Sequence, residues 1–362
     1  MRDSNREGAP TARWIDPVCE HLEMEARRPF VRLSDGRLMA VAGNATTVSI
    51  DDGATWQAPR PIFRADGPEL PPPGPGIPRN SGQLLATRDG VLVFVWMDER
   101  VLNWDDESGE PGPDARGDLW AIRSLDGGAT WVDRQRLFHG VCGHPPINMI
   151  ETVSGRIVVT NQFYLRLPGR NVIRVYSSGD GGKSWRGSNF IDLGGHGHHD
   201  GAFEPTFVQR RDGTLWMLIR TNWDRFWEAI SSDDGLSWRT IRPSSIKAST
   251  SPGYLTRLRS GRLLLVWNRL YPEGTDSFPR RSGQLSEDEA SWHREELSVS
   301  VSEDEGVNWS APRVIAREKD AWISYPYVFE PAPGQLWILT GQGDLRLRVA
   351  EEDLFGVETD ER

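Results

Sequence analysis

Short apolar or alternating stretches, each running into a polar turn, recur along most of the chain. Clear examples are residues 119–124, 171–177 and 297–302. Runs of this length that are bounded by turn-forming residues are typical of β-strands leading into hairpins. Because the chain also contains 37 Gly and 25 Pro, it is predicted to be an all-β protein.

Five of the turns share the pattern Ser-x-Asp-x-Gly-x-Thr-Trp, with Ser or Asn replacing Thr in some copies. The Asp can accept hydrogen bonds from backbone N–H groups of the turn, and the Gly takes a conformation that other residues disfavour. The Trp is expected to pack its ring between neighbouring sheets. These roles are structural. The five aspartates are Asp51, Asp126, Asp180, Asp233 and Asp304.

A second repeat, in which a glycine turn precedes an apolar strand, occurs six times. Its glycines lie roughly 50–70 residues apart, a spacing that suits one four-stranded sheet per repeat. Six such sheets predict a six-bladed β-propeller, and a stack of separate β domains is the rival arrangement. The six glycines are Gly36, Gly90, Gly155, Gly213, Gly261 and Gly334.

The repeats also predict how the chain is divided. The propeller is expected to span residues 21–356, with an N-terminal segment at 1–20 and a C-terminal tail at 357–362. The sixth unit ends with the apolar stretch 345–350 and lacks an outer strand. Because an unpaired sheet edge would remain otherwise, a strand from residues 14–22 is expected to close the ring.

Composition and charge exclude several classes of function. The net charge is −10 and there is no long run of Lys or Arg, so nucleic acid is not an expected partner. The longest apolar run, 91–97, is shorter than the ~20 residues of a membrane helix, and the N-terminus lacks the apolar core of a signal peptide. A cytoplasmic protein without membrane contacts is expected. Cys19 and Cys142 are too few for a disulfide framework.

Five such turns on a six-unit pattern resemble the sialidase (neuraminidase) superfamily, in which this turn is called the Asp box. The resemblance covers nearly the whole chain and implies a sialidase-type propeller that needs no cofactor or metal. It also implies a glycoside hydrolase acting on a terminal acidic sugar, sialic acid or a related one, of a carbohydrate substrate. Family members bind the sugar carboxylate with three arginines. They use a tyrosine nucleophile that is assisted by a glutamate, and an aspartate that acts as acid and base.

The residues that match these family positions lie in the expected order along the chain. Arg27 precedes the first Asp-Gly strand in Arg27-Arg28-Pro29, where the family has Arg-Ile-Pro. Glu204 and Arg220 match the glutamate strand and the second arginine strand. Arg294 lies upstream of the last Asp box, and Tyr325 follows it in the family's Ser-Tyr-Pro form. The resemblance therefore implies Arg27, Arg220 and Arg294 as carboxylate ligands, and Tyr325 and Glu204 as catalytic residues.

The chemistry of a sialic acid explains these residue types. Its anomeric carbon bears a carboxylate, which would repel a carboxylate nucleophile but not a neutral phenol. A phenol with a pKa near ~10 is a poor nucleophile, so Glu204 would have to accept the proton of Tyr325. Arginines can hold the sugar carboxylate with charge-assisted, bidentate hydrogen bonds.

One family feature is missing. Sialidases carry the acid/base Asp on a long loop in blade one, but here only residues 43–45 join the corresponding strands, and none of them is an aspartate. A general acid contributes roughly 10²–10⁴-fold, so another residue must supply the proton if the protein is a hydrolase. Asp98, at the end of a blade-two strand, is the first candidate. His144 and His198 are the others.

Two alternatives follow from the missing aspartate. A histidine beside the tyrosine and the arginines could act as the base in β-elimination from a uronic acid, which would make the protein a polysaccharide lyase, and the same propeller also supports hydrolases of other sugars. The protein could instead be a carbohydrate-binding propeller without catalysis. Histidine can also ligate zinc, but the spaced Cys/His pairs of known zinc sites are absent, so no metal is predicted.

Overall fold

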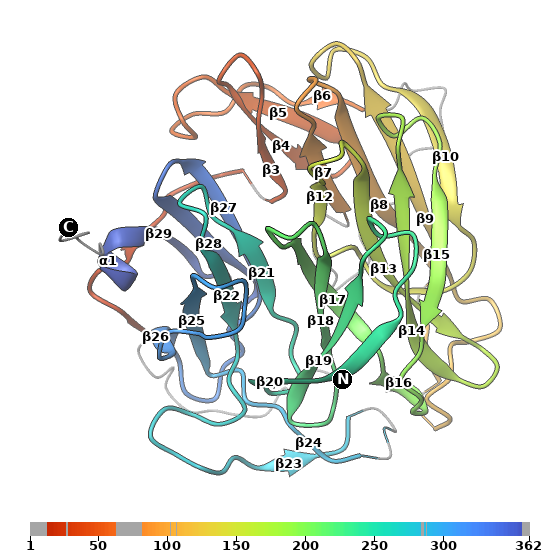
Figure 1. The fold of residues 1–362 in the computed structure, drawn as a ribbon, viewed down its shortest axis with the longest axis vertical. Helices are drawn as coiled ribbons and strands as arrows, with labels where there is room; N and C mark the ends of the chain where they lie inside the picture. The colour runs from red at the N-terminus through yellow and green to blue at the C-terminus, as the bar shows by residue number, and fades with distance from the viewer. Residues whose placement is uncertain are drawn as a thin grey trace.

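Six antiparallel sheets lie side by side around a central axis, as Figure 1 shows. The structure is a computed structural model and describes residues 13–26, 28–62, 82–101, 103–105, 107–283, 286 and 288–356. The tail at 357–362 lies outside the described residues. The main strands of each sheet follow chain order from the axis outwards, so each sheet is one propeller blade. The prediction of an all-β, six-bladed propeller is confirmed.

The first three blades are built from residues 30–201. Blade one contains β3 (Phe30–Arg32), β4 (Leu38–Ala42), β5 (Ala45–Ser49) and β6 (Arg60–Pro61). Blade two contains β7 (Gly82–Ala86), β8 (Leu92–Val101), β9 (Arg116–Ser124) and β10 (Val132–Phe138). Blade three contains β12 (Met149–Glu151), β13 (Ile157–Leu165), β14 (Arg170–Ser178) and β15 (Arg186–Ile191), with β11 (Cys142–His144) and β16 (Gly197–Gly201) added at its edges.

The last three blades follow in the same order. Blade four contains β17 (Phe203–Gln209), β18 (Leu215–Arg220), β19 (Arg225–Ser231) and β20 (Thr240–Lys247). Blade five contains β21 (Tyr254–Arg257), β22 (Leu263–Trp267), β25 (Glu296–Ser302) and β26 (Arg313–Arg317). Blade six contains β27 (Ser324–Ala332), β28 (Gln335–Gln342) and β29 (Arg346–Ala350). A small hairpin, β23 (Arg280–Arg281) and β24 (Ala290–Ser291), interrupts blade five, and the helix α1 (Glu351–Phe355) ends the described chain.

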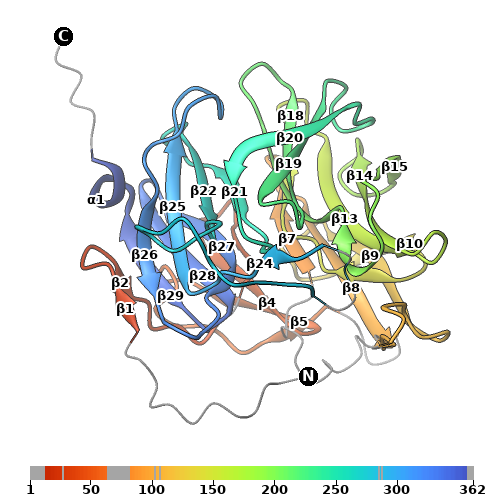
Figure 2. The ribbon, with the colours of Figure 1, turned by 90° about the horizontal axis from the view of Figure 1, so that it is seen from below.

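The N-terminal segment adds an outer strand to each of the last two blades. β2 (Glu20–His21) pairs with β29, and β1 (Trp14–Ile15) pairs with β26. Figure 2 shows these red strands beside the blue strands of blades five and six. Closer to the axis, the Tyr327 hydroxyl accepts a 3.0 Å hydrogen bond from the Phe30 backbone N–H, which joins blade six to blade one. The ring is therefore closed by contacts between the two ends of the chain.

The Asp boxes are turns held by their own side chains. In the first box, Asp51 accepts hydrogen bonds from the Thr55 backbone N–H at 2.9 Å and from the Thr55 hydroxyl at 2.6 Å. These bonds hold the pKa of Asp51 at about 2. Gly53 has a φ of 93°, and a Cβ there would lie 2.5 Å from the Trp337 ring of blade six. The glycine is therefore required both by the turn and by the close approach of the neighbouring blade.

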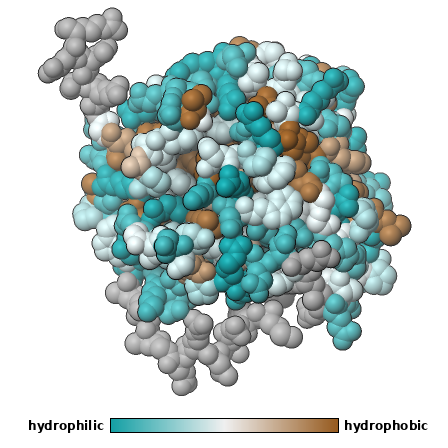
Figure 3. All heavy atoms as spheres, turned by 60° about the horizontal axis from the view of Figure 1, so that its bottom comes forward, coloured by the Kyte–Doolittle hydropathy of each residue, from teal (hydrophilic) through white to brown (hydrophobic). Residues whose placement is uncertain are grey.

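The apolar core is divided among the interfaces between blades. One cluster joins Met39 of blade one to Phe94 of blade two, and another joins Ile173 of blade three to Phe207 of blade four. On the face in Figure 3, hydrophilic residues predominate and hydrophobic residues form small, separate patches. Within the described part of the chain, no helix is long and apolar enough to span a membrane.

Candidate active site

Side chains from blades three to six lie close together near the axis, at the ends of their strands. Glu204 is the second residue of β17, Arg220 is the last residue of β18, and Tyr325 is the second residue of β27. Arg294 lies two residues before β25, and His144 ends β11. Because successive blades converge at the axis, these positions bring residues that are far apart in the sequence close together.

Tyr325, Glu204 and Arg220 form a hydrogen-bonded group among these side chains. The Tyr325 hydroxyl donates to Glu204 Oε1 at 2.8 Å, and Arg220 Nη1 donates to Glu204 Oε2 at 2.5 Å. Arg220 Nη1 also lies 3.5 Å from the Tyr325 hydroxyl oxygen. Arg220 and Glu204 are both buried. The predicted contact between the tyrosine and the glutamate is therefore present, with an arginine bridging the two groups.

Environment sets the protonation of this group. Burial on its own raises the pKa of Glu204, but the charges of Arg220 and His144 and the hydrogen bonds from Arg220 and Tyr325 outweigh it, so the pKa is lowered. Burial and the neighbouring Glu204 raise the pKa of Tyr325 above its usual value. At neutral pH, Glu204 is therefore a carboxylate that can accept a proton, and Tyr325 is a neutral phenol.

Both residues of this pair have strained backbones. The φ angle is 47° at Glu204 and 60° at Tyr325, in the left-handed region that residues other than glycine rarely adopt. Strain of this kind costs on the order of 1–3 kcal/mol per residue and is found mainly at functional sites. Its presence at two residues in contact supports a functional role for the pair.

Arg294 is buried and lies beside Tyr325. Its Nη2 donates to the Thr250 carbonyl at 2.9 Å, and its Nη1 donates to Gln342 Oε1 at 2.8 Å. Its guanidinium carbon lies 5.5 Å from the Tyr325 ring centroid. Burial and repulsion from Arg220 lower the pKa of Arg294 to about 10, which still leaves the side chain charged at neutral pH. No residue among these partners carries a negative charge.

The first predicted arginine, Arg27, lies outside the described residues. Its neighbour Arg28 lies near Tyr325: a Cβ on Gly341 would be 2.8 Å from Arg28 Nη2 and 3.0 Å from Tyr325 Cβ. The guanidinium carbon of Arg28 is 5.8 Å from the Tyr327 ring centroid. The sequence analysis did not select Arg28, because Arg27 takes the arginine position of the family's Arg-Ile-Pro and Arg28 takes the position of its Ile. It also missed Gly341, whose missing side chain leaves space between Arg28 and Tyr325.

His144 is the proton-transfer candidate that contacts the central group. Its ring stacks on Tyr325, with the two centroids 5.1 Å apart and the planes inclined by 23°. Its Nδ1 lies 2.6 Å from the Pro145 carbonyl oxygen, an acceptor, so Nδ1 carries the proton and Nε2 has a free lone pair. Burial lowers the pKa of His144, and Arg28 and Arg220 act in the same direction. At neutral pH, His144 is therefore a base and not an acid.

The other two proton-donor candidates occupy different surroundings. Asp98 is buried and pairs with Asp118 across the β8–β9 ladder, where it continues the row of Phe94 and Trp96 that faces blade one. The role of Asp98 as proton donor stays a prediction. His198 instead stacks on Trp104 of the blade-two loop, with ring centroids 3.7 Å apart. Within the described residues, no cluster of three or more His, Cys, Asp or Glu side chains is arranged to hold a metal ion.

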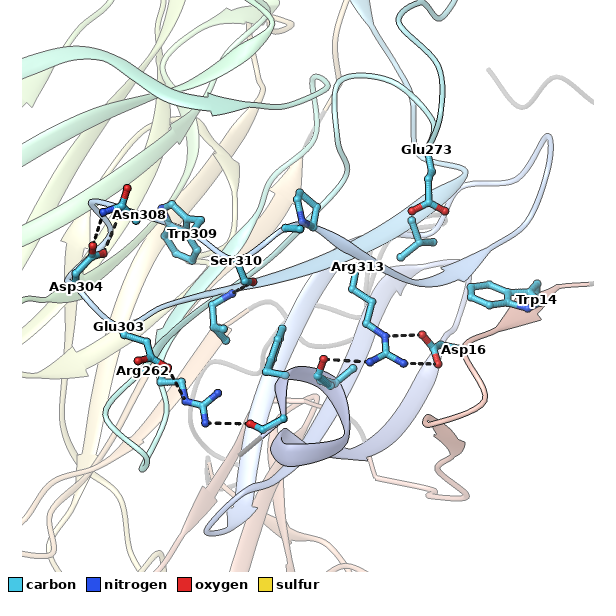
Figure 4. Close-up of a pocket in the computed structure, with 17 residues that line it drawn as sticks. Trp14, Asp16, Arg262, Glu273, Glu303, Asp304, Asn308, Trp309, Ser310 and Arg313 are labelled. Atoms are coloured by element: carbon cyan, nitrogen blue, oxygen red, sulfur yellow. Dashed lines mark hydrogen bonds and ion pairs between the residues drawn. The ribbon is translucent and has the colours of Figure 1, made fainter. Parts of the chain in front are cut away.

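A separate groove of about 850 Å³ lies at the outer edge of blade five, between the fifth Asp box and α1. Figure 4 shows that its charged groups point mainly at one another. Arg313 donates to both carboxylate oxygens of Asp16, and Asn308 donates to Asp304. Its polar groups support the fold, and it contains none of the residues that surround Tyr325.

The comparisons with known proteins agree with this architecture. The family model for the BNR repeat-like domain matches residues 78–338. The chain therefore belongs to the BNR repeat-like family, and its propeller is of the sialidase type. No curated protein matches the chain.

Several solved structures share the fold at low sequence identity. A protein of unknown function from Dyadobacter fermentans is 16% identical with a TM-score of 0.59, and the match covers 92% of this chain and 98% of that one. A variant of the NanB sialidase from Streptococcus pneumoniae is 14% identical with a TM-score of 0.59, covering 93% and 71%. A sialidase from Trypanosoma rangeli is 15% identical with a TM-score of 0.54, covering 90% and 55%.

Proposed function

We propose that the protein is a glycoside hydrolase of the sialidase type that removes a terminal acidic sugar from a glycan. One observation carries the proposal: a tyrosine bonded to a glutamate lies among three arginines, Arg28, Arg220 and Arg294. Arg220 forms an ion pair with the Glu204 carboxylate, whereas the described hydrogen-bond acceptors of Arg294 are neutral: Ser324, Gln342 and the Thr250 carbonyl. A substrate carboxylate would supply negative charge that the described contacts of Arg294 lack.

The mechanism assigns one role to each group. The arginines bind the sugar carboxylate and place the anomeric carbon against the Tyr325 oxygen. Glu204 accepts the phenol proton as the Tyr325 oxygen forms a bond to the anomeric carbon. The bond from this carbon to the leaving-group oxygen breaks, and that oxygen takes a proton from Asp98, the proposed general acid. Water then attacks the sugar–tyrosine intermediate, the Asp98 carboxylate accepts a proton from this water, and the phenol recovers its proton from Glu204.

Arg220 has a second role in this scheme. Its ion pair with Glu204 keeps the carboxylate deprotonated, and the same guanidinium lies near the phenol oxygen. As Glu204 takes up the proton its attraction for Arg220 weakens, while the bound sugar carboxylate still attracts the guanidinium. Arg220 thus couples proton transfer to substrate binding.

A second candidate function is β-elimination from a uronic acid, and His144 is the observation that favours it. Its free Nε2 is a base in contact with the arginine-lined pocket. In this reaction the base takes the proton α to the carboxylate, the leaving-group oxygen departs from the adjacent carbon, and a double bond forms between the two carbons. The arginines would stabilise the negative charge that develops on the carboxylate.

The deciding experiment is a parallel activity screen of the purified protein. Fluorogenic sialosides, uronides and neutral glycosides test hydrolysis, and the absorbance of unsaturated uronates tests elimination on polyuronides. Release of fluorophore from a sialoside or another acidic glycoside supports the proposed function, provided that Tyr325→Phe abolishes it. Unsaturated product that depends on His144 supports elimination instead. Binding without turnover of either kind would identify a carbohydrate-binding propeller.

A further inference from the structure

A fourth arginine, Arg281, lies beside the proposed carboxylate pocket. It belongs to β23, on the hairpin that interrupts blade five (Figure 1). Its guanidinium carbon is 5.2 Å from the Trp292 ring centroid and 6.0 Å from the Trp322 ring centroid. Arg281 is exposed, and within the described residues no acidic side chain forms an ion pair with it. We call Arg281, Trp292 and Trp322 the Arg281 shelf.

The Arg281 shelf is continuous with the central pocket. The guanidinium carbon of Arg294 lies 5.2 Å from the Trp292 centroid and 4.6 Å from the Trp322 centroid. The guanidinium carbons of Arg281 and Arg294 each lie 5.2 Å from the Trp292 centroid. The two guanidinium carbons are therefore separated by no more than twice 5.2 Å. A disaccharide can span such a separation. Groups on two adjoining sugar residues can therefore reach the two arginines together.

The two tryptophans differ in exposure in a way that suits a sugar-binding surface. Trp292 is 9% exposed, and its indole N–H donates to the Arg281 carbonyl at 3.2 Å, which fixes it against the hairpin. Trp322 is 41% exposed, although it stacks against Trp292 with centroids 6.1 Å apart. An exposed indole held by a rigid neighbour offers an apolar face at low entropic cost.

Charge defines the ligand further. Arg281 is an exposed cation that forms no ion pair with any acidic side chain of the described residues. An arginine stacked on aromatic rings is oriented for bidentate binding of a carboxylate or sulfate. The neighbouring Arg280 differs, because it is bonded to both carboxylate oxygens of Asp224. In the part of the chain that the structure describes, Arg280 therefore has an ion pair to maintain and Arg281 has none.

We propose that the Arg281 shelf is a second subsite that binds an anionic group on the sugar residue next to the terminal one. This inference rests on the proposed function, because it assumes that the central pocket holds the terminal acidic sugar. It narrows the substrate to acidic glycans in which two successive residues are charged. Sialic acid dimers and uronic acid dimers share this chemistry.

The test compares dimers with monomers in a protein that cannot turn them over. Isothermal titration calorimetry on Tyr325→Phe measures binding of N-acetylneuraminic acid and its α2,8-linked dimer, and of galacturonic acid and digalacturonic acid. At least one dimer is expected to bind about tenfold more tightly than its monomer. Adding Arg281→Gln should reduce this preference about tenfold, and adding Trp322→Leu should reduce it by a smaller factor.

Arg134→Gln is the matched control. Arg134 is also an exposed arginine over a tryptophan, with its guanidinium carbon 5.4 Å from the Trp120 centroid, but it lies on the outer strand β10. The control removes the same charge from the protein and should leave the dimer preference unchanged. Equal effects of the two substitutions, or monomers that bind as tightly as dimers, would overturn the subsite. Failure of every monomer to bind would instead contradict the proposed function of the central pocket.

Discussion

The Tyr325 hydroxyl donates a 2.8 Å hydrogen bond to Glu204, although the two residues are 121 positions apart in the sequence. Both have positive φ angles, and Arg220 contacts both side chains. A phenol and a carboxylate held in strained conformations, with an arginine beside them, form a unit that can transfer a proton as the phenol oxygen attacks.

Replacing Tyr325 with Phe should reduce kcat/KM by at least about 10³-fold, because the nucleophilic oxygen is lost. Glu204→Gln should cost about 10²–10⁴-fold, since it removes only the base. Urea unfolding of Tyr325→Phe should show a loss of about 0.5–1.5 kcal/mol, the contribution of one hydrogen bond. Tyr176→Phe is the control, because it removes a phenol hydroxyl from another buried tyrosine, at the interface between blades two and three. Comparable activity of Tyr325→Phe and Tyr176→Phe would exclude a nucleophilic tyrosine.

The pH dependence should separate the two possible bases. The pKa of Glu204 lies below its ordinary value of 4.5, so hydrolysis that uses Glu204 should fall only at pH values below this. The pKa of His144 lies below its ordinary value of 6.5. Elimination that uses His144 as the base should therefore fall as the pH drops and the imidazole becomes protonated. Profiles of kcat/KM for the wild type, Glu204→Gln and His144→Asn identify the group. An acid limb that disappears only in His144→Asn would favour elimination.

The free energy of unfolding should also depend on the protonation of Glu204. Because the folded-state pKa of Glu204 is depressed, its contribution to the free energy of unfolding is complete above pH 4.5 and is lost as the pH falls through the folded pKa. Urea unfolding at a series of pH values should therefore show a weaker acid dependence in Glu204→Gln than in the wild type. Parallel curves for the two proteins would contradict the depressed pKa.

Asp98→Asn tests the proposed general acid, since the change keeps the shape of the side chain but removes its proton. Activity on natural glycosides, which have poor leaving groups, should fall about 10²–10⁴-fold. Activated aryl glycosides should be affected much less, because their leaving groups depart without protonation. Equal losses of activity on both kinds of substrate would indicate a structural role for Asp98. No loss of activity would indicate that another residue donates the proton. The same comparison with His198→Asn serves as a control, because His198 stacks on Trp104.

Binding of an acidic sugar should stabilise the protein, because its carboxylate would add negative charge beside Arg294, whose described hydrogen-bond acceptors are neutral. At a ligand concentration of 100 times Kd the expected gain is about 2.7 kcal/mol, and it should appear as a higher Tm. High salt should reduce the gain, although a partly buried site is screened less than the surface. A neutral sugar should have no such effect. An equal rise in Tm with the methyl ester of the sugar acid would show that charge is not recognised.

Ser178→Ala should destabilise the propeller without changing its chemistry. The buried Ser178 hydroxyl donates to Asp180 at 2.8 Å and accepts from the Gly182 backbone N–H at 2.9 Å, so its loss leaves a buried donor unsatisfied. The expected cost is about 1–3 kcal/mol by urea unfolding. The kinetic constants should be unchanged, because the third Asp box lies at the periphery of blade three. A change in KM would imply that the box communicates with the pocket.

The repeated turns allowed the fold to be predicted because their information is local. A serine, an aspartate and a glycine within five positions specify a hairpin by hydrogen bonds inside the turn, as the Asp51 and Asp180 boxes show. Six copies of a turn and strand then fix the number of blades. Glu204, Arg220, Arg294 and Tyr325 were implied by the resemblance to the sialidase superfamily and not by the repeats, and the structure brings their side chains close together.

Other features depended on contacts between distant segments. The N-terminus pairs with blade five as well as blade six, and no local pattern distinguishes two-residue strands such as β1 and β2. The motif likewise does not indicate that Arg28 lies near Tyr325, because that contact depends on the approach of its guanidinium to Gly341 of blade six. The tautomer of His144 follows from the position of a single carbonyl group.

The sequence by itself thus determined the architecture and the types of residue in the pocket, because turns and strands are specified by neighbouring residues. Only the tertiary structure decided which groups meet. Hydrogen bonds and charge interactions act over a few ångströms, and the pairing of Tyr325 with Glu204, the stacking of His144 and the approach of Arg281 to Trp322 exist only once six blades close into a ring.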